Sequence, residues 1–422
     1  MNNSMLPVLI FALSYVFFIL FPAKRMFFAV GASLLIVLTG ILTWQEALAA
    51  VNWNVMGIFV GMLFVADIFL DSRMPACIAE SIVNRTRTIA WAILALCALT
   101  GILSIFIENV ATVLIMAPIA LSLAKKLKID PRNMMIAIAI ASNLQGAATL
   151  IGDPPSMLLG GFAKMNFGDF FFYKGRPGIF FAVQSGALAS FVVLYFLFRK
   201  HHQETGRIKT EKIISWVPTF ILVALIAALA ASSFFDKEFS YLAGMICVVF
   251  GFIALIWDRF VHKHPVRATL RSLDWDTTFF LAGIFIIVGG LTRSGWIESA
   301  AVYLSDSVGD DIFVTYTILV VASVLLSAFI DNVPYLAAML PVAMGMADKL
   351  SIEPQLFLFG LLIGACLGGN ITPIGASANI VACGLLKKEG YEVSFLEFVR
   401  IGLPYTILAT SAAYIFVWLV WA

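Results

Sequence analysis

Long apolar blocks separated by short polar interruptions make up most of this chain. A helix that spans a lipid bilayer needs about 20 mostly apolar residues, and many of the blocks are of that order. The pattern therefore predicts an all-α polytopic membrane protein with about ten spans. The blocks fall at residues 5–21, 26–43, 55–72, 88–107, 110–123, 133–163, 177–198, 214–234, 238–257, 276–293, 312–330, 335–347, 355–386 and 397–421.

Several of these blocks do not fit a plain span. Block 88–107 is separated from the next block only by Glu108 and Asn109, and block 312–330 is separated from the next only by residues 331–334. Such pairs predict two re-entrant helical hairpins whose tips stop inside the bilayer. Two further blocks, 133–163 and 355–386, are too long for one span and contain stretches rich in Gly, Pro and Thr. They are expected to form broken transmembrane helices.

The two halves of the chain repeat each other. Ser104–Gly161 aligns without a gap on Ser327–Gly384, with 20 identities in 58 pairs. The identities include Asn, Pro, Gly and Thr positions, which two unrelated apolar helices would not share by chance. Upstream, Asn52–Asn54 matches Asp274–Asp276 at an offset of 222. We expect a first repeat at 1–198, a polar linker at 199–212 and a second repeat at 213–422.

Basic residues set the expected orientation, because cytoplasmic loops carry an excess of Lys and Arg. With all basic clusters in the cytoplasm, the first hairpin opens toward the cytoplasm and the second toward the outside. This arrangement is an inverted-topology repeat, which many secondary transporters share. Both termini are expected to be extracytoplasmic, in a multi-pass protein of the cell inner (plasma) membrane. The clusters lie at residues 24–25, 85–87, 125–132, 199–212, 259–271 and 387–388.

Composition excludes several classes of protein. Hydrophobic residues make up 61% of the chain, charged residues only 12%, and the mean hydropathy is +0.99. These values exclude an ordinary soluble enzyme, a disordered chain and a nucleic-acid binder. The four His lie in predicted cytoplasmic loops, the five Cys lack metal-ligand spacing, and no P-loop pattern is present. We expect no cofactor and no ATP use by this chain, whereas an ATPase partner stays open.

Polar side chains gather where the apolar pattern breaks. Backbone that leaves a helix inside a membrane needs partners within the protein, and transporters use such breaks to bind ions and anions. The expected substrate- or ion-binding residues come from both repeats, with Na⁺ at the hairpin tips as the one metal expected. They are Glu108, Asn109, Thr112, Asn143, Gly146, Thr149, Gly152, Asp153, Asp331, Asn332, Gly369, Asn370, Thr372, Gly375, Ser377 and Asn379.

Three carboxylates are the most informative of these residues, since a charge in mid-membrane costs at least about 2.5–3.5 kcal/mol. For Glu108 and Asp331, ion or proton coupling and helix capping both stay open. For Asn109 and Asn332, capping of the hairpin tip and ligation are equally open. Asp153 has no acidic counterpart in the second repeat, which favours a specific proton or cation role.

Other residues near the breaks receive structural interpretations. The glycines of the two breaks are expected to supply positive-φ turns and close approach of backbone. Asp67 and Asp71 lie at the end of block 55–72 and are assigned to an interface rather than to the site.

The motifs resemble a known family. The strings ENVATVLIMAP at 108–118 and ASNLQGAATLIGDPPSMLLG at 141–160 are similar to the arsenical pump and P-protein branch of the ion transporter superfamily, which has a citrate transporter-like domain. The string that starts at Gly368 resembles the C-terminal signature of that branch. The superfamily also contains dicarboxylate and citrate carriers and NhaD-type Na⁺/H⁺ antiporters. The resemblance implies a scaffold and a moving transport subdomain, an elevator motion, and ion and substrate binding at hairpin tips and broken helices.

The sequence favours a secondary active transporter that moves a small anion or arsenite, driven by a H⁺ or Na⁺ gradient. A Na⁺/H⁺ antiporter is the main alternative, and a channel is a further one. The Ser-Asn-Thr hairpin tips of the dicarboxylate carriers are absent, which weakens that reading. A membrane-embedded enzyme is disfavoured because all four His lie outside the apolar blocks. The expected partners are the bilayer, the small solute and a second copy bound through the scaffold helices.

Overall fold

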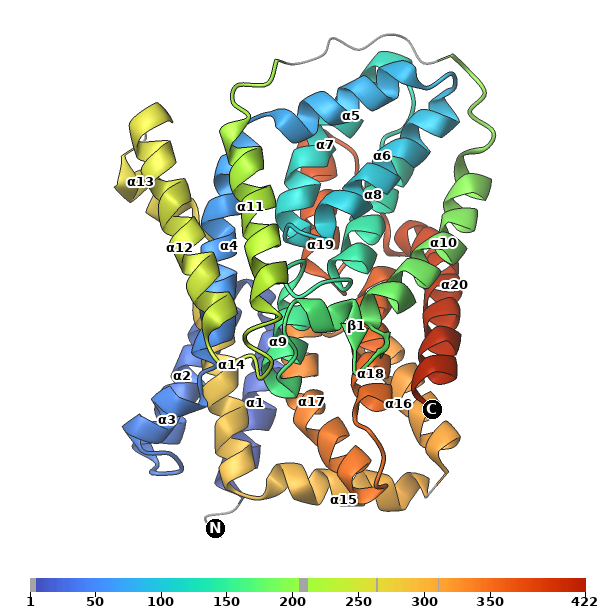
Figure 1. The fold of residues 1–422 in the computed structure, drawn as a ribbon. Helices are drawn as coiled ribbons and strands as arrows, with labels where there is room; N and C mark the ends of the chain where they lie inside the picture. Colours follow the sequence, from blue (N-terminus) through green and yellow to red (C-terminus); the bar gives the residue numbers. More distant parts are fainter. Residues whose placement is uncertain (1–4, 205–211, 263–264, 310) are drawn as a thin grey trace.

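The computed structural model is almost entirely helical, which confirms the predicted fold class (Figure 1). It describes residues 5–204, 212–262, 265–309 and 311–422. Of the helices in these ranges, six are individually long and apolar enough to cross a bilayer, or seven if the bent pair Trp296–Val308 and Ile312–Ser327 counts as one span. Several other apolar blocks form shorter helices, so spans cannot be equated with blocks.

Ten α-helices make up the first half of the chain. They are α1 (Leu6–Leu20), α2 (Arg25–Leu38), α3 (Trp44–Ala50), α4 (Trp53–Asp71), α5 (Met74–Arg85), α6 (Ile89–Ser104), α7 (Asn109–Leu127), α8 (Arg132–Gly146), α9 (Pro154–Ala163) and α10 (Ile179–Phe198). Two short 3₁₀ helices, η1 (Pro22–Lys24) and η2 (Gly168–Phe170), lie between them.

Ten α-helices in the same order make up the described part of the second half. They are α11 (Val217–Ser232), α12 (Leu242–Trp257), α13 (Val266–Ser272), α14 (Trp275–Arg293), α15 (Trp296–Val308), α16 (Ile312–Ser327), α17 (Asn332–Lys349), α18 (Gln355–Gly368), α19 (Ser377–Lys388) and α20 (Phe395–Trp421). A π-helical turn, η3 (Asp258–His262), and a 3₁₀ helix, η4 (Gly369–Ile371), complete this half. The boundaries predicted for the repeats and the linker stay predictions, because residues 205–211 of the linker lie outside the described ranges.

The helices form two groups that lie side by side in Figure 1. The scaffold group contains α1–α4 and α11–α14, and the hairpin group contains α6–α10 and α16–α20. Helix α5 runs across the upper end of the view and its counterpart α15 runs across the lower end. Counterparts at opposite ends of the molecule are what an inverted repeat requires.

In the scaffold group, helices of the first half pack against helices of the second half. Helix α4 packs along α12, and its counterpart α14 packs along α2. The contacts are so close that Gly57 meets the backbone of Gly244, at 3.0 Å from the point where a Cβ would stand, and Gly283 meets the Cβ of Ala29 at 2.9 Å. Glycine is needed there for proximity, because any side chain would separate the helices.

One short β-hairpin departs from the all-helical expectation. Strands β1 (Phe172–Tyr173) and β2 (Arg176–Pro177) pair antiparallel between α9 and α10. The turn residues Lys174 and Gly175 both have positive φ, 49° and 78°. Two successive positive-φ residues match the right-handed twist of a tight hairpin, which explains why strands form in this connection.

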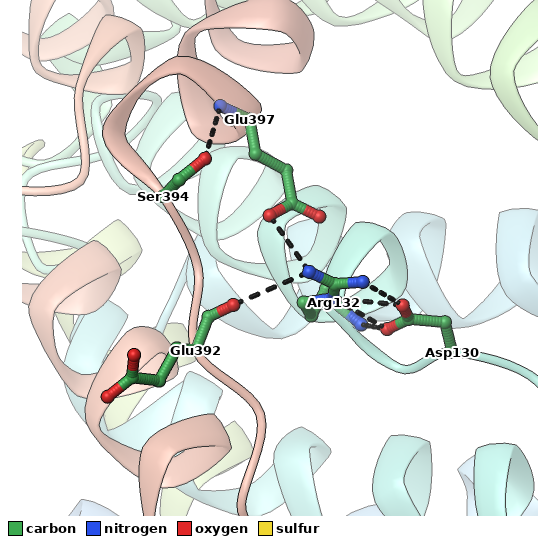
Figure 2. Close-up of polar contacts among 5 residues, drawn as sticks. All are labelled: Asp130, Arg132, Glu392, Ser394 and Glu397. Carbon is green, nitrogen blue, oxygen red and sulfur yellow. Dashed lines mark hydrogen bonds and ion pairs between the residues drawn. The ribbon is translucent and has the colours of Figure 1, made fainter.

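A polar cluster ties the start of α8 to the start of α20, as Figure 2 shows. The Arg132 guanidinium forms a forked ion pair with Asp130, with Nη2 2.5 Å from Oδ2 and Nε 3.1 Å from Oδ1. Its Nη1 donates to the Glu397 carboxylate at 3.2 Å. The Ser394 hydroxyl caps α20 by accepting from the Glu397 amide at 3.2 Å. The sequence grouped Arg132 with the basic clusters and did not predict these partners.

Arg132→Ala is expected to lower stability by about 1 kcal/mol or less, because the ion pairs are partly exposed to solvent. The Arg132 hydrogen bonds lower the pKa of Asp130. A lowered folded-state pKa adds stability above the unfolded value of about 4, and that stability is lost as pH falls through the folded value. Thermal unfolding in detergent should therefore separate the variant from wild type at pH 7 and less so near pH 3. Lys388→Ala, at an exposed position on α19, is the control and should match wild type.

Candidate functional site

Each hairpin tip ends in a carboxylate that caps the following helix. The Glu108 side chain accepts from the Ala111 amide at 3.0 Å at the start of α7. The Asp331 side chain accepts from the Val333 amide at 3.0 Å at the start of α17. Capping is therefore one role of both carboxylates, whereas Asn109 and Asn332, for which capping was left open, are the first residues of the helices and not their caps.

The side chains of Asn109 and Asn332 instead take part in hydrogen bonds that link each hairpin tip to the broken helix of the same half. The Ser104 hydroxyl donates to Asn109 Oδ1 at 2.6 Å and lies 3.0 Å from the Ser142 hydroxyl of α8. In the second half, Asn332 contacts Ser327 at 3.0 Å, and in the flipped amide orientation it also donates to the Ala365 and Gly375 carbonyls. The hairpin tip and the broken helix of each half are thus one polar unit.

Threonine and glycine residues of the two breaks complete this polar unit, and they do not line the cavity described below. The Thr149 hydroxyl donates to the Ile105 carbonyl, and its counterpart Thr372 donates to the Ala328 carbonyl. The glycines of the breaks do not have the positive φ that the sequence led us to expect, since the described positive-φ glycines are all elsewhere. Their role is close approach, because a Cβ on Gly152 would lie 2.5 Å from the Gly146 carbonyl oxygen.

An amide cluster joins the broken helices of the two halves. Asn143 Nδ2 donates to Asn370 Oδ1 at 2.9 Å and to Asn379 Oδ1 at 2.8 Å. Asn379 Nδ2 in turn donates to the carbonyls of Gly369 and Thr372, both at 2.9 Å. Asn370 Nδ2 is buried without a hydrogen-bond partner. A buried donor without a partner is uncommon in native proteins.

A cavity lies between the scaffold group and the hairpin group. Half-buried Glu108 and Asp331 and buried Asp153 all line it, with Asn109, Asn143, Asn332 and Ser377. Asp153 lies at the start of α9, but its side chain does not cap that helix. The wall contributed by the scaffold group consists of Arg25, Asp274 and Thr277.

Arg25 supplies the basic side chain of the cavity. Its Nη1 lies 2.5 Å from Asp331 Oδ2, its Nη2 donates to the Thr277 hydroxyl at 3.1 Å, and the guanidinium carbon lies 5.0 Å from the Phe280 ring centroid. Thr277 is itself held by Asp274, to which it donates at 2.6 Å. The assignment of Arg25 to a cytoplasmic basic cluster is therefore wrong. The first turn of α2 enters the site, where the guanidinium offsets a carboxylate.

The two breaks differ in what their second helices offer the cavity. Helix α9 begins with Pro154 and Pro155, which have no N–H to donate. Helix α19 begins at Ser377 after Ala376 with no side-chain cap, and Ala376, Ser377 and Ala378 line the cavity. At the breaks themselves, the first half thus presents the Asp153 carboxylate, whereas the second half presents Ala376 and Ser377 at the positive end of a helix.

A second cavity adjoins the first along α4. It shares Glu108, Val110, Asp274 and Thr277 with the first cavity and continues along α4 past Asp67 to Leu70, toward the end of α4 that joins α5. The corresponding hollow on α14, lined by Phe285, Val288, Gly289 and Thr292, shares no lining residue with the site. Among the described residues, the cavity that adjoins the site therefore runs along α4.

Of the sixteen residues singled out from the sequence, seven line the cavity: Glu108, Asn109, Asn143, Asp153, Asp331, Asn332 and Ser377. The others surround it and shape the breaks: Thr112, Gly146, Thr149, Gly152, Gly369, Asn370, Thr372, Gly375 and Asn379. Ion or substrate binding by any of them stays a prediction.

The sequence analysis did not assign four polar residues of the two cavities to the site. Arg25, Asp274 and Thr277 line the site, and Asp67 lines the adjoining cavity, although it was assigned to an interface. Asp274 had a signal, since the match of 274–276 to 52–54 placed it in the repeat. Arg25 had none, because position 25 relates to the site only through the packing of α2 on α14.

The chain matches one family model and is similar to several membrane transporters. The CitMHS model, described as citrate transporter, matches residues 15–364. An uncharacterized transporter of Mycobacterium tuberculosis is 29% identical, with 99% of this chain and 98% of that protein covered. The P protein of Mus musculus is 26% identical over 89% of this chain and 54% of that protein.

Two solved structures share the fold. The YdaH transporter of Alcanivorax borkumensis superposes with a TM-score of 0.62 at 14% identity, covering 91% of this chain and 87% of that one. MtrF of Neisseria gonorrhoeae, described with a class of antimetabolite efflux pumps, superposes with a TM-score of 0.57 at 13% identity, covering 91% and 83%. At these identities the likeness concerns the fold alone.

Proposed function

Because the chain belongs to the CitMHS citrate transporter family and is a multi-pass membrane transporter, we propose that it is a secondary active transporter that moves a small anion or an arsenite-like solute by coupling to H⁺ or Na⁺. The observation that carries this proposal is the meeting of Glu108, Asp153 and Asp331 in one cavity between two helix groups. Asp274 of the scaffold wall brings the carboxylates that line this cavity to four, and such a cluster is costly within a membrane unless its members bind protons, cations or a permanent counter-ion.

The division of the cavity suggests where each species binds. Glu108 and Asp153, on the first half, are suited to a proton or Na⁺. The start of α19, with Ser377 and the nearby orphan donor of Asn370, is suited to an oxyanion or a hydroxylated solute. The positive charge of Arg25 lies between the two regions and is engaged by Asp331.

An elevator motion is supported by the arrangement of the two groups. Helices α5 and α15 connect the scaffold group to the hairpin group at opposite ends of the molecule (Figure 1). The site lies at the boundary between the groups, and the adjoining cavity continues from it along α4. A rigid shift of one group past the other would exchange the side of approach, which is alternating access. We place the protein in the inner membrane with both termini outside, as the basic residues suggest.

A Na⁺/H⁺ antiporter is the second candidate. The same carboxylates favour it, because cation exchange needs no anion subsite. The two candidates differ in whether a solute other than Na⁺ and H⁺ crosses. A counterflow screen in proteoliposomes with arsenite, sulfate, carboxylates and Na⁺ separates them. Flux of Na⁺ against H⁺ with no solute counterflow would overturn the first proposal in favour of the second.

Glu108→Gln and Asp331→Asn are expected to leave the fold intact, because the capping oxygen is kept. Gradient-driven transport should fall about 10- to 100-fold, the effect of losing a charged partner worth about 1.5–3 kcal/mol. Flux in proteoliposomes at fixed Na⁺ and pH gradients is the measurement. Asp311→Asn is the matched control, since Asp311 caps α16 from an exposed position with bonds of 2.8 and 3.0 Å. Equal flux in all three variants would reduce Glu108 and Asp331 to caps.

A further inference from the structure

Corresponding positions on α9 and α19 meet the scaffold group differently. Gly161 of α9 and Gly384 of α19 match at the repeat offset of 223. A Cβ on Gly161 would stand 2.7 Å from Val55 Cγ2 and 2.9 Å from Asn52 Nδ2, at the start of α4. A Cβ on Gly384 would stand in open space, with no atom of the described residues within 4 Å. Helix α9 is therefore docked on the scaffold at a position where α19 is not.

The scaffold surface that Gly161 meets has a counterpart at the start of α14. Asn52 caps α4 by accepting from the Val55 amide at 3.1 Å, and Asp274 caps α14 by accepting from the Thr277 amide at 2.9 Å. The two caps correspond at an offset of 222. Asp274 and Thr277 therefore form the surface that is equivalent to Asn52 and Val55.

The contacts within the scaffold follow the same correspondence. Gly61 of α4 contacts Cys247 of α12, and at the offset of 222 Gly283 of α14 contacts Ala29 of α2. The two scaffold walls are thus alike beyond their first turns. The unequal docking of α9 and α19 therefore reflects where the hairpin group lies along the scaffold.

The scaffold meets the two corresponding helices at different turns. The start of α14 shares the cavity with Ser377, the first residue of α19. The start of α4 instead meets Gly161, whose counterpart Gly384 lies seven residues beyond Ser377. Seven residues of α-helix span about 10 Å. The two halves are therefore described about two helical turns out of register with each other.

We propose that Gly161 and Gly384 are the alternate docking positions of the hairpin group on the scaffold. In an inverted repeat, the opposite access state is reached when the two halves exchange their arrangements. A shift of the hairpin group by about 10 Å brings Gly384 to Thr277 and releases Gly161 from Val55. Glycine at both positions allows the close approach, because any side chain would hold the helices apart.

The two docked arrangements are not equivalent. Asn52 Nδ2 donates to the Gly161 carbonyl at 3.4 Å, which is a long hydrogen bond. Asp274, at the corresponding position, has no proton to donate to the Gly384 carbonyl when it is ionised. The docking of Gly384 then rests on packing without this hydrogen bond, so the contact at Gly161 favours the described state.

This inference rests on the proposed alternating-access function and makes a signed prediction. A large side chain at Gly161 obstructs the described state and should shift the protein toward the opposite state. A large side chain at Gly384 fits the described state and obstructs only the opposite one. If the two glycines were independent packing positions, a change at one would not affect the contact made at the other.

The experiment measures how fast two pairs of introduced cysteines form disulfides in the full-length protein in proteoliposomes. Val55→Cys with Gly161→Cys reports the described state, and Thr277→Cys with Gly384→Cys reports the opposite state. A disulfide needs Cα atoms within about 7 Å, so each pair links only when its helices are docked. Mass spectrometry of the linked peptides gives the rates with and without an imposed pH or Na⁺ gradient.

The two pairs should respond in opposite directions. Cys77 and Cys383, the partly exposed native cysteines, are first replaced by Ser. The pair at 277 and 384 should link more slowly than the pair at 55 and 161, and Gly161→Leu should raise its rate severalfold. Gly384→Leu should make the pair at 55 and 161 insensitive to gradients that slow its linkage in the wild-type background.

A milder change guards against misfolding. Gly161→Ala should also raise the rate of the pair at 277 and 384, by less than Gly161→Leu does. Val55→Ala should reverse that effect, because Val55 Cγ2 is the nearest atom that the new Cβ would meet.

Ile36→Cys with Gly290→Cys is the control pair, because a Cβ on Gly290 would stand 3.2 Å from Ile36 Cδ1 within the scaffold group. Its rate should be the same in every variant and gradient. If the pair at 277 and 384 never links while the pair at 55 and 161 responds to gradients, the hairpin group moves but Gly384 is not its docking position, and the proposal is wrong. If both pairs ignore every gradient and variant, alternating access itself is contradicted, so the two failures are distinguishable.

Discussion

Gly152→Ala is expected to abolish folding of the first broken helix, with a loss of about 3 kcal/mol or more. A Cβ at this position would stand 2.5 Å from the Gly146 carbonyl oxygen and 2.8 Å from the Ser104 carbonyl oxygen. Overpacking of a core usually costs about 1–3 kcal/mol, and the value rises when the obstructing atoms cannot rotate away. Both obstructing atoms here are backbone, so the break and the hairpin tip must separate. Thermal unfolding and the yield of monodisperse protein in detergent report the loss.

The second half offers an independent copy of the same test. A Cβ on Gly375 would stand 2.6 Å from the Gly369 carbonyl oxygen and 2.9 Å from the Ala328 carbonyl oxygen. Gly375→Ala should therefore match Gly152→Ala. Gly384→Ala is the control, since Gly384 lies within α19 with open space around it, and alanine there should stabilise the helix by up to about 1 kcal/mol. Stable protein from Gly152→Ala would contradict the close approach.

Asp153→Asn is expected to flatten the pH dependence of transport while solute still binds. The Asp153 side chain lines the cavity at 6% exposure and does not cap α9. Asparagine keeps the shape and an acceptor oxygen but cannot take up or release a proton. Gradient-driven flux should fall about 10- to 100-fold, as expected for loss of a charged partner. The measurement is flux between about pH 5.5 and 8.5, with solute binding assayed separately.

Asp169→Asn provides the control for that profile. Asp169 accepts from the Asn166 amide at 2.8 Å in the connection after α9, away from the cavity. Its replacement should leave the shape of the pH profile unchanged. If Asp153→Asn retains the wild-type profile, Asp153 is a structural residue of the break, and the coupling group must be sought at Glu108 or Asp331.

Much of the architecture could be predicted because a membrane allows few backbone structures to span it. Apolar length predicts helices, and the interruptions at Glu108 and Asp331 predict where the chain turns inside the bilayer. The duplicated strings show that both breaks are built alike, down to Thr149 and Thr372, which donate to corresponding carbonyls. These features are local in sequence or repeated, so a pattern can reveal them.

The scaffold side of the site was not predictable for a physical reason. Arg25 reaches Asp331 only because α2 packs on α14 and α14 lies beside α17. No periodicity encodes which helices pack together. The glycines of the breaks illustrate the same limit: their presence signals an unusual backbone, but close approach and positive φ leave the same mark in a sequence.

The exchanged packing of α4 on α12 and of α2 on α14 has a consequence for biosynthesis. Gly61 leaves the ribosome roughly 190 residues before its partner Cys247, a delay of roughly 10–40 s at ordinary elongation rates. During that time the glycine-lined face of α4 can contact only lipid or the membrane insertion machinery. The first repeat therefore cannot finish folding before the second is inserted. Separately expressed halves should each be unstable, and co-expression should restore both, because each carries the missing wall of the other.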